Sequence, residues 1–153
     1  MNGLKRAAVS CILTNGDHLL LLKRNKAPHI GKYLPVGGKI EPYETAQSAV
    51  VREVLEETGF VIDAPIFCGS LIESSPLDHY NWISFIFAHE IPKVDPPYCD
   101  EGELVWVSAF QLEHLDIPPT DLPIYKAVLS KTPFVYEATF DASMDMTSLI
   151  KLA

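Results

Sequence analysis

Alternation of apolar runs with turn residues predicts a chain of strands interrupted by two helices. Ala7–Thr14 is rich in small and β-branched residues and precedes the turn dipeptide Asn15-Gly16, so His18–Lys23 is predicted to be the return strand of a hairpin. The same pattern predicts further strands at Tyr33–Val36, Asn81–His89, Leu104–Val107 and Phe134–Phe140, and an extended segment at Val61–Leu71 that Pro65 interrupts. Many strands with one early and one late helix are typical of a mixed α/β layer fold.

The two helices are predicted by their boundary residues. Glu44–Thr58 contains no Gly or Pro, whereas Pro42 stands just before it and Gly59 just after it, as helix start and stop signals require. Asp121–Leu129 forms the second helix if Pro123 lies in its first turn. Later prolines punctuate loops, and no segment is long enough to be a linker. We therefore expect one domain over residues 1–153.

Composition narrows the class of protein further. The chain has 12 Lys and Arg against 20 Asp and Glu, a net charge of −8, so it should repel nucleic-acid polymers and anionic membrane surfaces. Its three cysteines are scattered and form no CxxC motif, which argues against a disulfide framework or a zinc site. No apolar run is long enough to span a membrane. A reduced, cytoplasmic monomer or homodimer is the expectation.

Three acidic residues of the first predicted helix fall on one side of it. With Glu44 at zero and about 100° per residue, Glu53, Glu56 and Glu57 lie between about 120° and 220°. The opposite side is apolar and is formed by Val50, Val51, Val54 and Leu55. The helix is thus amphipathic, but its polar side concentrates negative charge.

This concentration of charge destabilises an isolated helix. Like charges three or four residues apart cost roughly 0.2–0.5 kcal/mol per pair, and the helix dipole disfavours anions in the C-terminal half. Arg52 can pair with Glu56 but cannot balance three carboxylates, whereas a divalent cation such as Mg²⁺ or Mn²⁺ can. A solvated acidic face is the alternative. The small residues Ala46 and Ala49 beside the acids, and the preceding Gly37-Gly38, favour a ligand site.

Residues 38–60 resemble the Nudix signature, Gly-x5-Glu-x7-Arg-Glu-apolar-x-Glu-Glu-x-Gly-apolar. Every defined position is filled, by Gly38, Glu44, Arg52, Glu53, Val54, Glu56, Glu57, Gly59 and Phe60. The resemblance implies a Nudix-type α/β/α sandwich with a mixed β-sheet. It also implies hydrolysis of a nucleoside diphosphate linked to another moiety.

The resemblance assigns roles within the signature. Glu53, Glu56 and Glu57 would bind Mg²⁺, with Mn²⁺ as a substitute, and the carbonyl of Gly37 or Gly38 would add a ligand. Glu44 would support these ligands, Arg52 would orient the carboxylates, and Glu57 or Glu53 would accept the proton of the attacking water. Tyr43 and Val36 stand where many members have Gly and Pro, which bears on the substrate rather than on the chemistry.

Outside the signature, charge and aromatic character suggest substrate contacts. The basic segment 23–39 contains Arg24 and Lys39, which are our candidates for phosphate binding. The resemblance implies a further catalytic glutamate outside the signature, for which the acidic cluster near residue 100 offers Glu103 as first candidate and Glu101 as second; an acidic turn without a catalytic role is the alternative. Tyr33 and Asn81 are candidates for contacts to a base. Trp82, Phe85 and Phe87 are candidates too, although aromatic residues at alternate strand positions are more often core.

The leading hypothesis is a metal-dependent hydrolase of a nucleoside triphosphate, including oxidised purines such as 8-oxo-dGTP. An ADP-ribose or nucleotide-sugar pyrophosphatase is the alternative, for which Pro76, 16 residues beyond Phe60, is a weak marker. A non-hydrolysing Nudix ligand sensor and an acidic interaction domain without metal are two non-enzymatic alternatives. The intact Glu53, Glu56 and Glu57 argue against the sensor.

Overall fold

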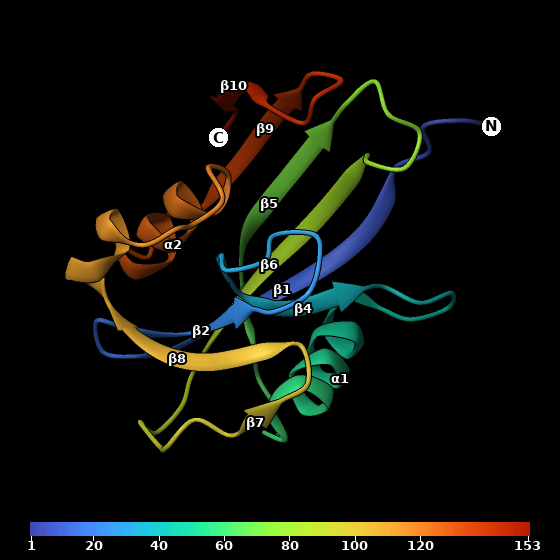
Figure 1. Ribbon diagram of the computed structural model, residues 1–153. Coiled ribbons are helices and arrows are strands. Elements are labelled where there is room, and N and C mark those ends of the chain that lie inside the picture. Colours follow the sequence, from blue (N-terminus) through green and yellow to red (C-terminus); the bar gives the residue numbers. More distant parts are fainter.

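A ten-stranded mixed sheet forms the centre of the computed structural model, which describes residues 1–153 (Figure 1). The strands are β1 (Arg6–Asn15), β2 (His18–Arg24), β3 (Tyr33–Leu34), β4 (Val36–Lys39), β5 (Ile66–Ser74), β6 (Trp82–Glu90), β7 (Tyr98–Cys99), β8 (Gly102–Ser108), β9 (Phe134–Phe140) and β10 (Met146–Lys151). The helices are α1 (Ala46–Thr58), the 3₁₀ helix η1 (Ala109–His114) and α2 (Asp121–Leu129).

The strand order is β10-β9-β5-β6-β1-β2-β8-β7, with β3 paired to β2 and β4 paired to β1. The pairs β1·β6 and β5·β9 are parallel, and the other pairs are antiparallel. Strand β1 is long enough to pair along one edge with β4 through Ala8–Cys11 and then with β2 through Leu13–Asn15. This places the glycines of β4 at the middle of the sheet.

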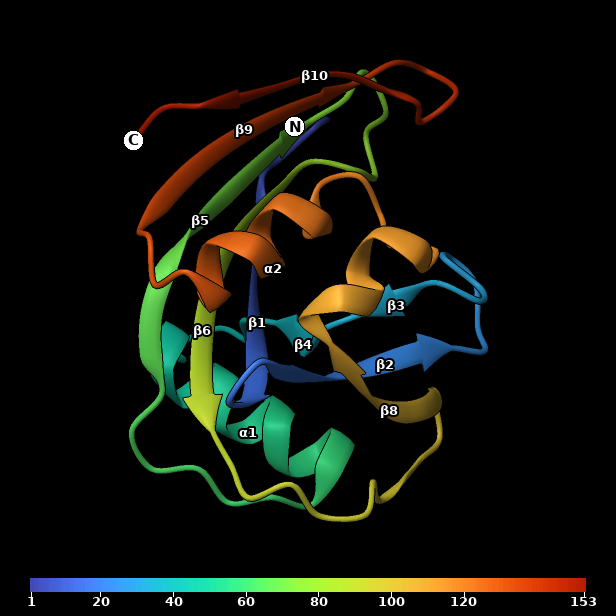
Figure 2. The same ribbon diagram turned by 90° about the vertical axis from the view of Figure 1, so that its left-hand side faces the viewer.

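Helices cover the two faces of the sheet separately. In Figure 1, α2 lies to the left and α1 at the lower right, with the strands between them, and Figure 2 shows η1 beside α2. Strand β2 shows why two cores form: Leu20 and Leu22 pack in the α1 core, whereas Leu19 and Leu21 pack in the α2 core. A strand buried on both faces carries an unbroken apolar run rather than an alternating one. The predicted α/β/α sandwich with a mixed sheet is confirmed.

Most predicted elements occur close to their predicted bounds. The predicted hairpin is present, but its two turn residues are Gly16 and Asp17, because Asn15 is the last residue of β1 and pairs with His18. Helix α2 and strand β9 have the predicted bounds. Three predictions need correction. The predicted strand Tyr33–Val36 is two short strands, the part of Val61–Leu71 before the predicted break at Pro65 forms no strand, so that β5 begins at Ile66, and the first helix begins at Ala46 rather than Glu44. Strands β7 and β10 and helix η1 were not predicted.

None of the helices combines the length and apolar character needed to cross a lipid bilayer.

Candidate active site

Helix α1 begins one residue after Thr45, which caps it. Thr45 Oγ1 accepts a hydrogen bond from the Ser48 amide at 3.0 Å, and the Thr45 amide donates to Ser48 Oγ at 3.0 Å. This reciprocal capping box satisfies two amides at the helix start, so the helix cannot include Glu44. At the other end, Gly59 adopts the left-handed conformation with φ of 77°, which favours glycine. Glu44 therefore lies in the loop before the helix, where its carboxylate accepts hydrogen bonds from Arg52.

The buried face of α1 fixes the direction of its acidic side chains. Ala49, Val50 and Val54 are fully buried against the sheet, and burying each valine contributes about 1.5–3 kcal/mol. Two details of the predicted wheel were wrong. Ala49 packs into the core instead of leaving room for a ligand, and Leu55 is 48% exposed rather than buried. The acidic side of the helix is thus turned away from the sheet core.

The three helix acids line one pocket with the β7–β8 turn. Glu53, Glu56 and Glu57 share a depression of about 250 Å³ with Tyr98, Cys99, Asp100 and Glu101. The segments lie more than 40 residues apart in sequence and meet because β7 packs beside α1. We call this depression the carboxylate pocket. It gathers four glutamates and one aspartate at a single surface.

Arg52 organises the acids around it. Its Nε and Nη2 donate to the two carboxylate oxygens of Glu44 at 2.7 and 2.9 Å, a paired geometry that fixes both side chains. Its Nη1 donates to Glu53 Oε1 at 2.8 Å and more weakly to Glu56, and its Nη2 also donates to the carbonyl of Lys39 at 3.0 Å. One guanidinium therefore ties the helix, the loop before it and the end of β4 together.

Glu44 is held as a carboxylate by this arrangement. Hydrogen bonds from Arg52, and then one from the Glu41 amide at 3.0 Å, lower its pKa to about 2. The same contacts raise the pKa of Arg52 above its ordinary value. Glu44 lies outside the carboxylate pocket, so its contacts are those of a supporting residue.

Glu53 and Glu57 lie against the two glycines of β4. A Cβ at Gly38 would overlap the carboxylate of Glu53, and the Gly37 amide donates to Glu57 Oε2 at 3.1 Å. Burial raises the pKa of Glu57 to about 8, against the hydrogen bond from Gly37, and the neighbouring Glu101 and Glu53 raise it further. Burial also raises the pKa of Glu53, whereas Arg52 opposes this shift. Only glycine permits so close an approach of helix and strand.

The donors at this pocket suit a hard divalent ion. Carboxylate oxygens and backbone carbonyls are the ligands that such ions prefer. In the present conformation no three acidic groups close around one point, because Glu53 Oε1 accepts from Arg52 and Glu57 Oε2 accepts from Gly37. The second oxygen of Glu53 carries no hydrogen bond within the protein and is available as a ligand, whereas Glu57 also has the Glu101 side chain within hydrogen-bond reach. The donor set fits the ion that the Nudix signature implies.

The β7–β8 turn brings Glu101, not Glu103, to the carboxylate pocket. Glu101 lines it and raises the pKa of Glu57, whereas Glu103 is paired across strands with Lys23 and Tyr98 and lies on the neighbouring surface. The order of the two candidates is therefore corrected, since the reversal of the chain at Asp100–Gly102 separates residues only two apart. No local pattern in the sequence distinguishes them.

The two phosphate-binding candidates differ in their surroundings. Arg24 Nε donates to the carbonyls of Lys26 and Pro28 at 3.0 and 2.8 Å, and its Nη1 lies 3.9 Å from Glu101. Arg24 thus holds its own loop while bordering the carboxylate pocket through Glu101. Lys39 has an exposed side chain directly after the two glycines, and only its carbonyl is engaged by Arg52.

The predicted base contacts separate in space. Asn81 is buried, its Nδ2 donates to the Leu77 carbonyl at 2.8 Å and its Oδ1 accepts from the Ser75 amide at 3.2 Å. Both ends of the amide bind the β5–β6 loop, which contradicts the predicted base contact. Tyr33 is half-buried on the α2 side of the sheet, where its carbonyl accepts from Tyr125 Oη at 3.0 Å and its ring lies 5.8 Å from Lys23 Nζ.

Comparison with known sequences decides the family. The family model described as NUDIX domain matches residues 4–129, which is most of the chain. The chain belongs to the Nudix family. It is a Nudix hydrolase, a pyrophosphohydrolase, and such enzymes generally use divalent metal ions. This favours an enzyme over both non-enzymatic hypotheses.

Individual relatives agree on the fold but differ in their named substrates. The 8-oxo-dGTP diphosphatase of Escherichia coli is 30% identical over 120 residues, 76% of this Nudix chain and 90% of that relative. The ADP-ribose pyrophosphatase of Methanocaldococcus jannaschii is 37% identical over 81 residues, 52% of this chain and 48% of that one. The crystal structure of the MutT protein from Bacillus halodurans superimposes with a TM-score of 0.81 at 24% identity, covering 96% of this chain and 97% of that one, which shows the shared fold.

Proposed function

We propose that this Nudix hydrolase cleaves the diphosphate linkage of a nucleoside triphosphate with bound Mg²⁺, and that oxidised purines such as 8-oxo-dGTP are its substrates. The observation that carries the proposal is the gathering of Glu53, Glu56, Glu57 and Glu101 in one pocket beside the paired glycines. Carboxylates are concentrated in this way at the cost of mutual repulsion. A bound cation would offset this repulsion between the carboxylates.

In this proposal the helix acids and the β4 backbone hold the metal. Glu53, Glu56 and Glu57 supply carboxylate oxygens, the carbonyl of Gly38 adds a neutral oxygen, and Glu101 completes the acidic wall. The bound ion supplies Lewis-acid polarisation of the phosphate and a lowered pKa of the attacking water. Arg52 and Glu44 position these ligands without touching the substrate.

The remaining groups act on the phosphates and on the proton. Glu57 or Glu53 accepts the proton of the water as it attacks phosphorus, because both carboxylates line the pocket. Lys39 and Arg24 neutralise the phosphate chain from the two borders of the site. Glu103 has no role in the proton transfer or in phosphate binding in this proposal. Tyr33 stays a candidate for a contact to the base, on the α2 side of the sheet.

An ADP-ribose pyrophosphatase is the second candidate, favoured by the similarity to the archaeal enzyme of that name. The same carboxylate pocket would serve both reactions, since each attacks a diphosphate linkage. The difference lies in what is attached to the second phosphate.

A substrate panel tests both proposals. Purified protein is assayed with 8-oxo-dGTP, dGTP, CTP and ADP-ribose in the presence of Mg²⁺, with EDTA and Glu57→Gln as controls, and kcat/KM is measured by product chromatography. We expect the largest kcat/KM for 8-oxo-dGTP and loss of turnover in both controls. A preference for ADP-ribose would establish the alternative, and hydrolysis of no substrate by folded, Mg²⁺-supplied protein would overturn the proposal.

A further inference from the structure

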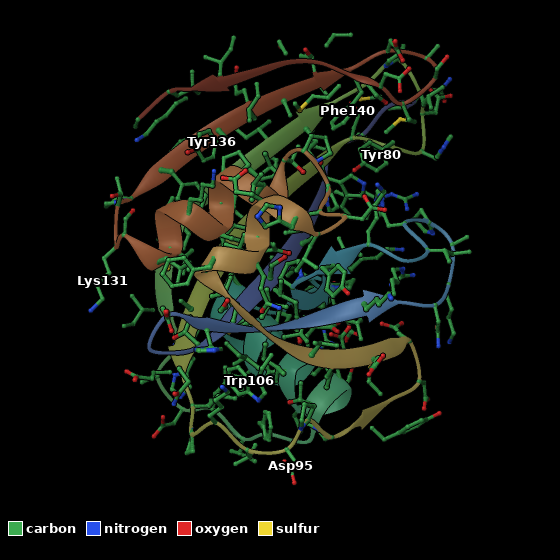
Figure 3. All side chains as sticks on the ribbon, turned by 60° about the vertical axis from the view of Figure 1, so that its left-hand side comes forward. Tyr80, Asp95, Trp106, Lys131, Tyr136 and Phe140 are labelled. Carbon is green, nitrogen blue, oxygen red and sulfur yellow. The ribbon has the colours of Figure 1, made fainter.

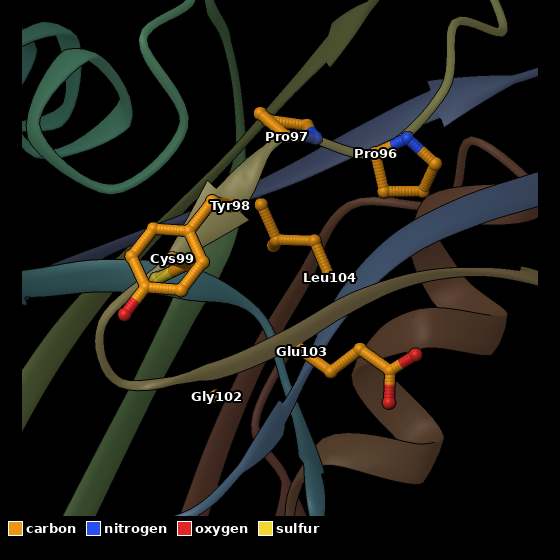
Figure 4. Close-up of a pocket in the computed structure, with 7 residues that line it drawn as sticks. All are labelled: Pro96, Pro97, Tyr98, Cys99, Gly102, Glu103 and Leu104. Atoms are coloured by element: carbon orange, nitrogen blue, oxygen red, sulfur yellow. The ribbon is translucent and has the colours of Figure 1, made fainter.

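The turn between β7 and β8 is held at the carboxylate pocket by the end of β2. The β2·β8 pairing continues to Arg24 and Gly102, the last partners before the turn. Directly beyond them, the Asn25 amide donates to the Glu101 carbonyl at 2.9 Å. Figure 4 shows Gly102 on the ribbon where the turn ends and β8 begins. The backbone of Glu101 is therefore fixed by β2 rather than by α1, which carries the three helix acids.

Gly102 allows β8 to approach β2 closely at this point. A Cβ at Gly102 would lie 2.1 Å from the Lys23 carbonyl oxygen and 2.9 Å from the carbon of that carbonyl, and both are backbone atoms of β2. The φ angle of Gly102 lies outside the left-handed region, so the requirement for glycine is steric and not conformational. A larger residue would separate β8 from β2 and move Glu101 with β8.

The other arm of the turn is anchored as well. Trp106 Nε1 on β8 donates to the carbonyl of Val94 at 2.8 Å, which ties the loop before β7 to the sheet. Figure 3 shows Trp106 above the part of that loop that holds Asp95. Cys99, at the end of β7, is buried in the α1 core. Since both arms of the turn are fixed, the position of the Glu101 carboxylate depends on its side-chain contacts.

Arg24 is the only cation that forms an ion pair with Glu101. Its Nη1 lies 3.9 Å from Glu101 Oε2, which is a contact between charges rather than a hydrogen bond. The other guanidinium nitrogens bind the loop that follows. Nε donates to the carbonyls of Lys26 and Pro28 at 3.0 and 2.8 Å, and Nη2 donates to that of Ala27 at 3.3 Å. These bonds fix the plane of the guanidinium and leave Nη1 for Glu101.

Repulsion within the carboxylate pocket acts against the position of Glu101. Its side chain lies within hydrogen-bond reach of Glu57, and its charge acts on both Glu57 and Glu53. The Glu101 side chain is 40% exposed, so it can turn into solvent without leaving a cavity. The charge of Arg24 beside Glu101 offsets the repulsion. Without Arg24, the carboxylate of Glu101 would favour solvent over the pocket.

We propose that Arg24 is a positioning residue, which holds the Glu101 carboxylate at the carboxylate pocket and so completes the oxygen donors available to the metal. The inference rests on the proposed function, because it takes this pocket as the place where the ion binds. The role is separate from the charge that Arg24 offers to the phosphates. A phosphate contact strengthens binding of the substrate, whereas a positioned carboxylate strengthens binding of the metal before any substrate arrives. Gly102 supports the same position through the backbone of β8.

Binding of Mn²⁺ in the absence of nucleotide tests the proposal apart from turnover. Free Mn²⁺ is measured by electron paramagnetic resonance during titration of the wild type, Arg24→Gln, Glu101→Gln and the double variant. Each single variant should weaken Mn²⁺ binding by about 10-fold, the lower end for residues that orient metal ligands, and the double variant no more than Glu101→Gln alone. Lys26→Gln removes an exposed cation from the same loop and is the matched control, which should keep the wild-type affinity.

Thermal unfolding and kinetics complete the test. Unfolding curves show whether each variant is folded, and Arg24→Lys, which keeps the cation, takes the place of Arg24→Gln if that variant does not fold. In steady-state assays, Arg24→Gln should raise the Mn²⁺ concentration needed for half-maximal turnover. That rise should vanish in the Glu101→Gln background, whereas a rise in the KM of the nucleotide, which reports the phosphate contact, should persist there.

The outcomes distinguish this proposal from the one it rests on. If Arg24→Gln leaves Mn²⁺ binding unchanged, or weakens it equally with and without the Glu101 carboxylate, the positioning role is wrong while the hydrolytic function stands. If the wild type hydrolyses nucleotide but binds no Mn²⁺ alone, the same comparison is made with the half-maximal Mn²⁺ concentrations. If it neither binds Mn²⁺ nor hydrolyses any nucleotide, the proposed function fails and the positioning role fails with it. A loss of affinity that disappears in the Glu101→Gln background supports both.

Discussion

The helices α1 and α2 lie on opposite faces of one sheet but carry their charges in opposite ways. In α2, Asp121 stands in the first turn and Lys126 in the last, the arrangement that the helix dipole favours. In α1, no acidic residue occupies the first turn and no basic residue the last, while Glu56 and Glu57 lie near the C-terminal end. The charges of α2 agree with the helix dipole, and those of α1 oppose it.

The difference shows which helix is shaped by chemistry. Helix α2 buries Ile124, Tyr125, Ala127 and Val128, and its polar groups support the fold. Helix α1 is held by its cap, its buried valines and the contacts of Arg52. Its acids would cost stability with no return unless they bind a cation. In the proposed function, the carboxylate pocket at α1 is the part of the molecule in which binding of a cation outweighs the cost in stability.

Glu57→Gln should have the largest effect on activity. We expect turnover to fall by at least about 100-fold, because the variant loses both a metal ligand and a proton acceptor. In metal-free buffer its melting temperature should rise, since burial raises the pKa of Glu57 and the neutral amide avoids that cost. Steady-state kinetics and calorimetry measure the two quantities.

Tyr125→Phe is the matched variant on α2. It removes the hydrogen bond from Tyr125 Oη to the Tyr33 carbonyl and should cost about 1 kcal/mol of stability without changing turnover. The contrast between the helices would be refuted if Glu57→Gln kept normal turnover or if Tyr125→Phe lost turnover to the same degree.

Arg52→Gln should lower activity and stability together. Turnover should fall by about 10–100-fold, as is usual when the residues that orient metal ligands are changed. The melting temperature in metal-free buffer should fall, opposite in sign to Glu57→Gln, because Glu44, Glu53 and the Lys39 carbonyl lose their donor. Arg6→Gln, at an exposed arginine beside Trp82, is the control. Equal turnover in Arg52→Gln and Arg6→Gln would show that Arg52 does not support the active site.

Two glycines in the strands allow the same comparison between a residue at the site and a residue that serves packing. Gly38→Ala places a Cβ against the flexible end of Glu53, so turnover should fall while the melting temperature changes little. Gly69→Ala places a Cβ against the backbone carbonyl of Phe134, which cannot move without disturbing the β5·β9 pair, and should cost about 1–3 kcal/mol. Kinetics and thermal unfolding of both variants give the test. A large loss of stability in Gly38→Ala would mean that Gly38 serves packing instead.

The pH dependence of stability should give the smallest effect. Asp121 and Glu57 have pKa values raised by burial to about 7 and about 8, so the folded protein keeps protons that the unfolded chain releases above about pH 4–4.5. The melting temperature in metal-free buffer should therefore fall as pH rises from about 5 to 8. Mg²⁺ should remove the part of the slope due to Glu57. Asp121→Asn should reduce the part that remains, to which Glu73 contributes as well because burial also raises its pKa. A slope unaffected by either would contradict both assignments.

The sequence predicted the elements with strong local signals. The Asn15-Gly16 dipeptide marked the hairpin one residue before the observed turn at Gly16 and Asp17, and Asp121–Leu129 was predicted to its observed bounds because Pro123 is tolerated in the first turn of a helix. Short elements escaped prediction: β7 has only two residues, and β10 forms by pairing with β9 rather than by its own pattern. The start of α1 was placed early because Glu44 is a good helix former, whereas the Thr45–Ser48 capping box decides the start.

What the sequence determined by itself is the chemistry of α1. The spacing of Glu53, Glu56 and Glu57 puts them on one side of any helix, and residues 38–60 together carry the resemblance to the Nudix signature. The tertiary structure decided what surrounds them. Glu101 in place of Glu103, the engagement of Asn81 in its own loop and the exposed Tyr98 all depend on how distant strands pair. Periodicity reports neighbours along the chain, whereas contacts across a sheet depend on strand order and register, which no local pattern encodes.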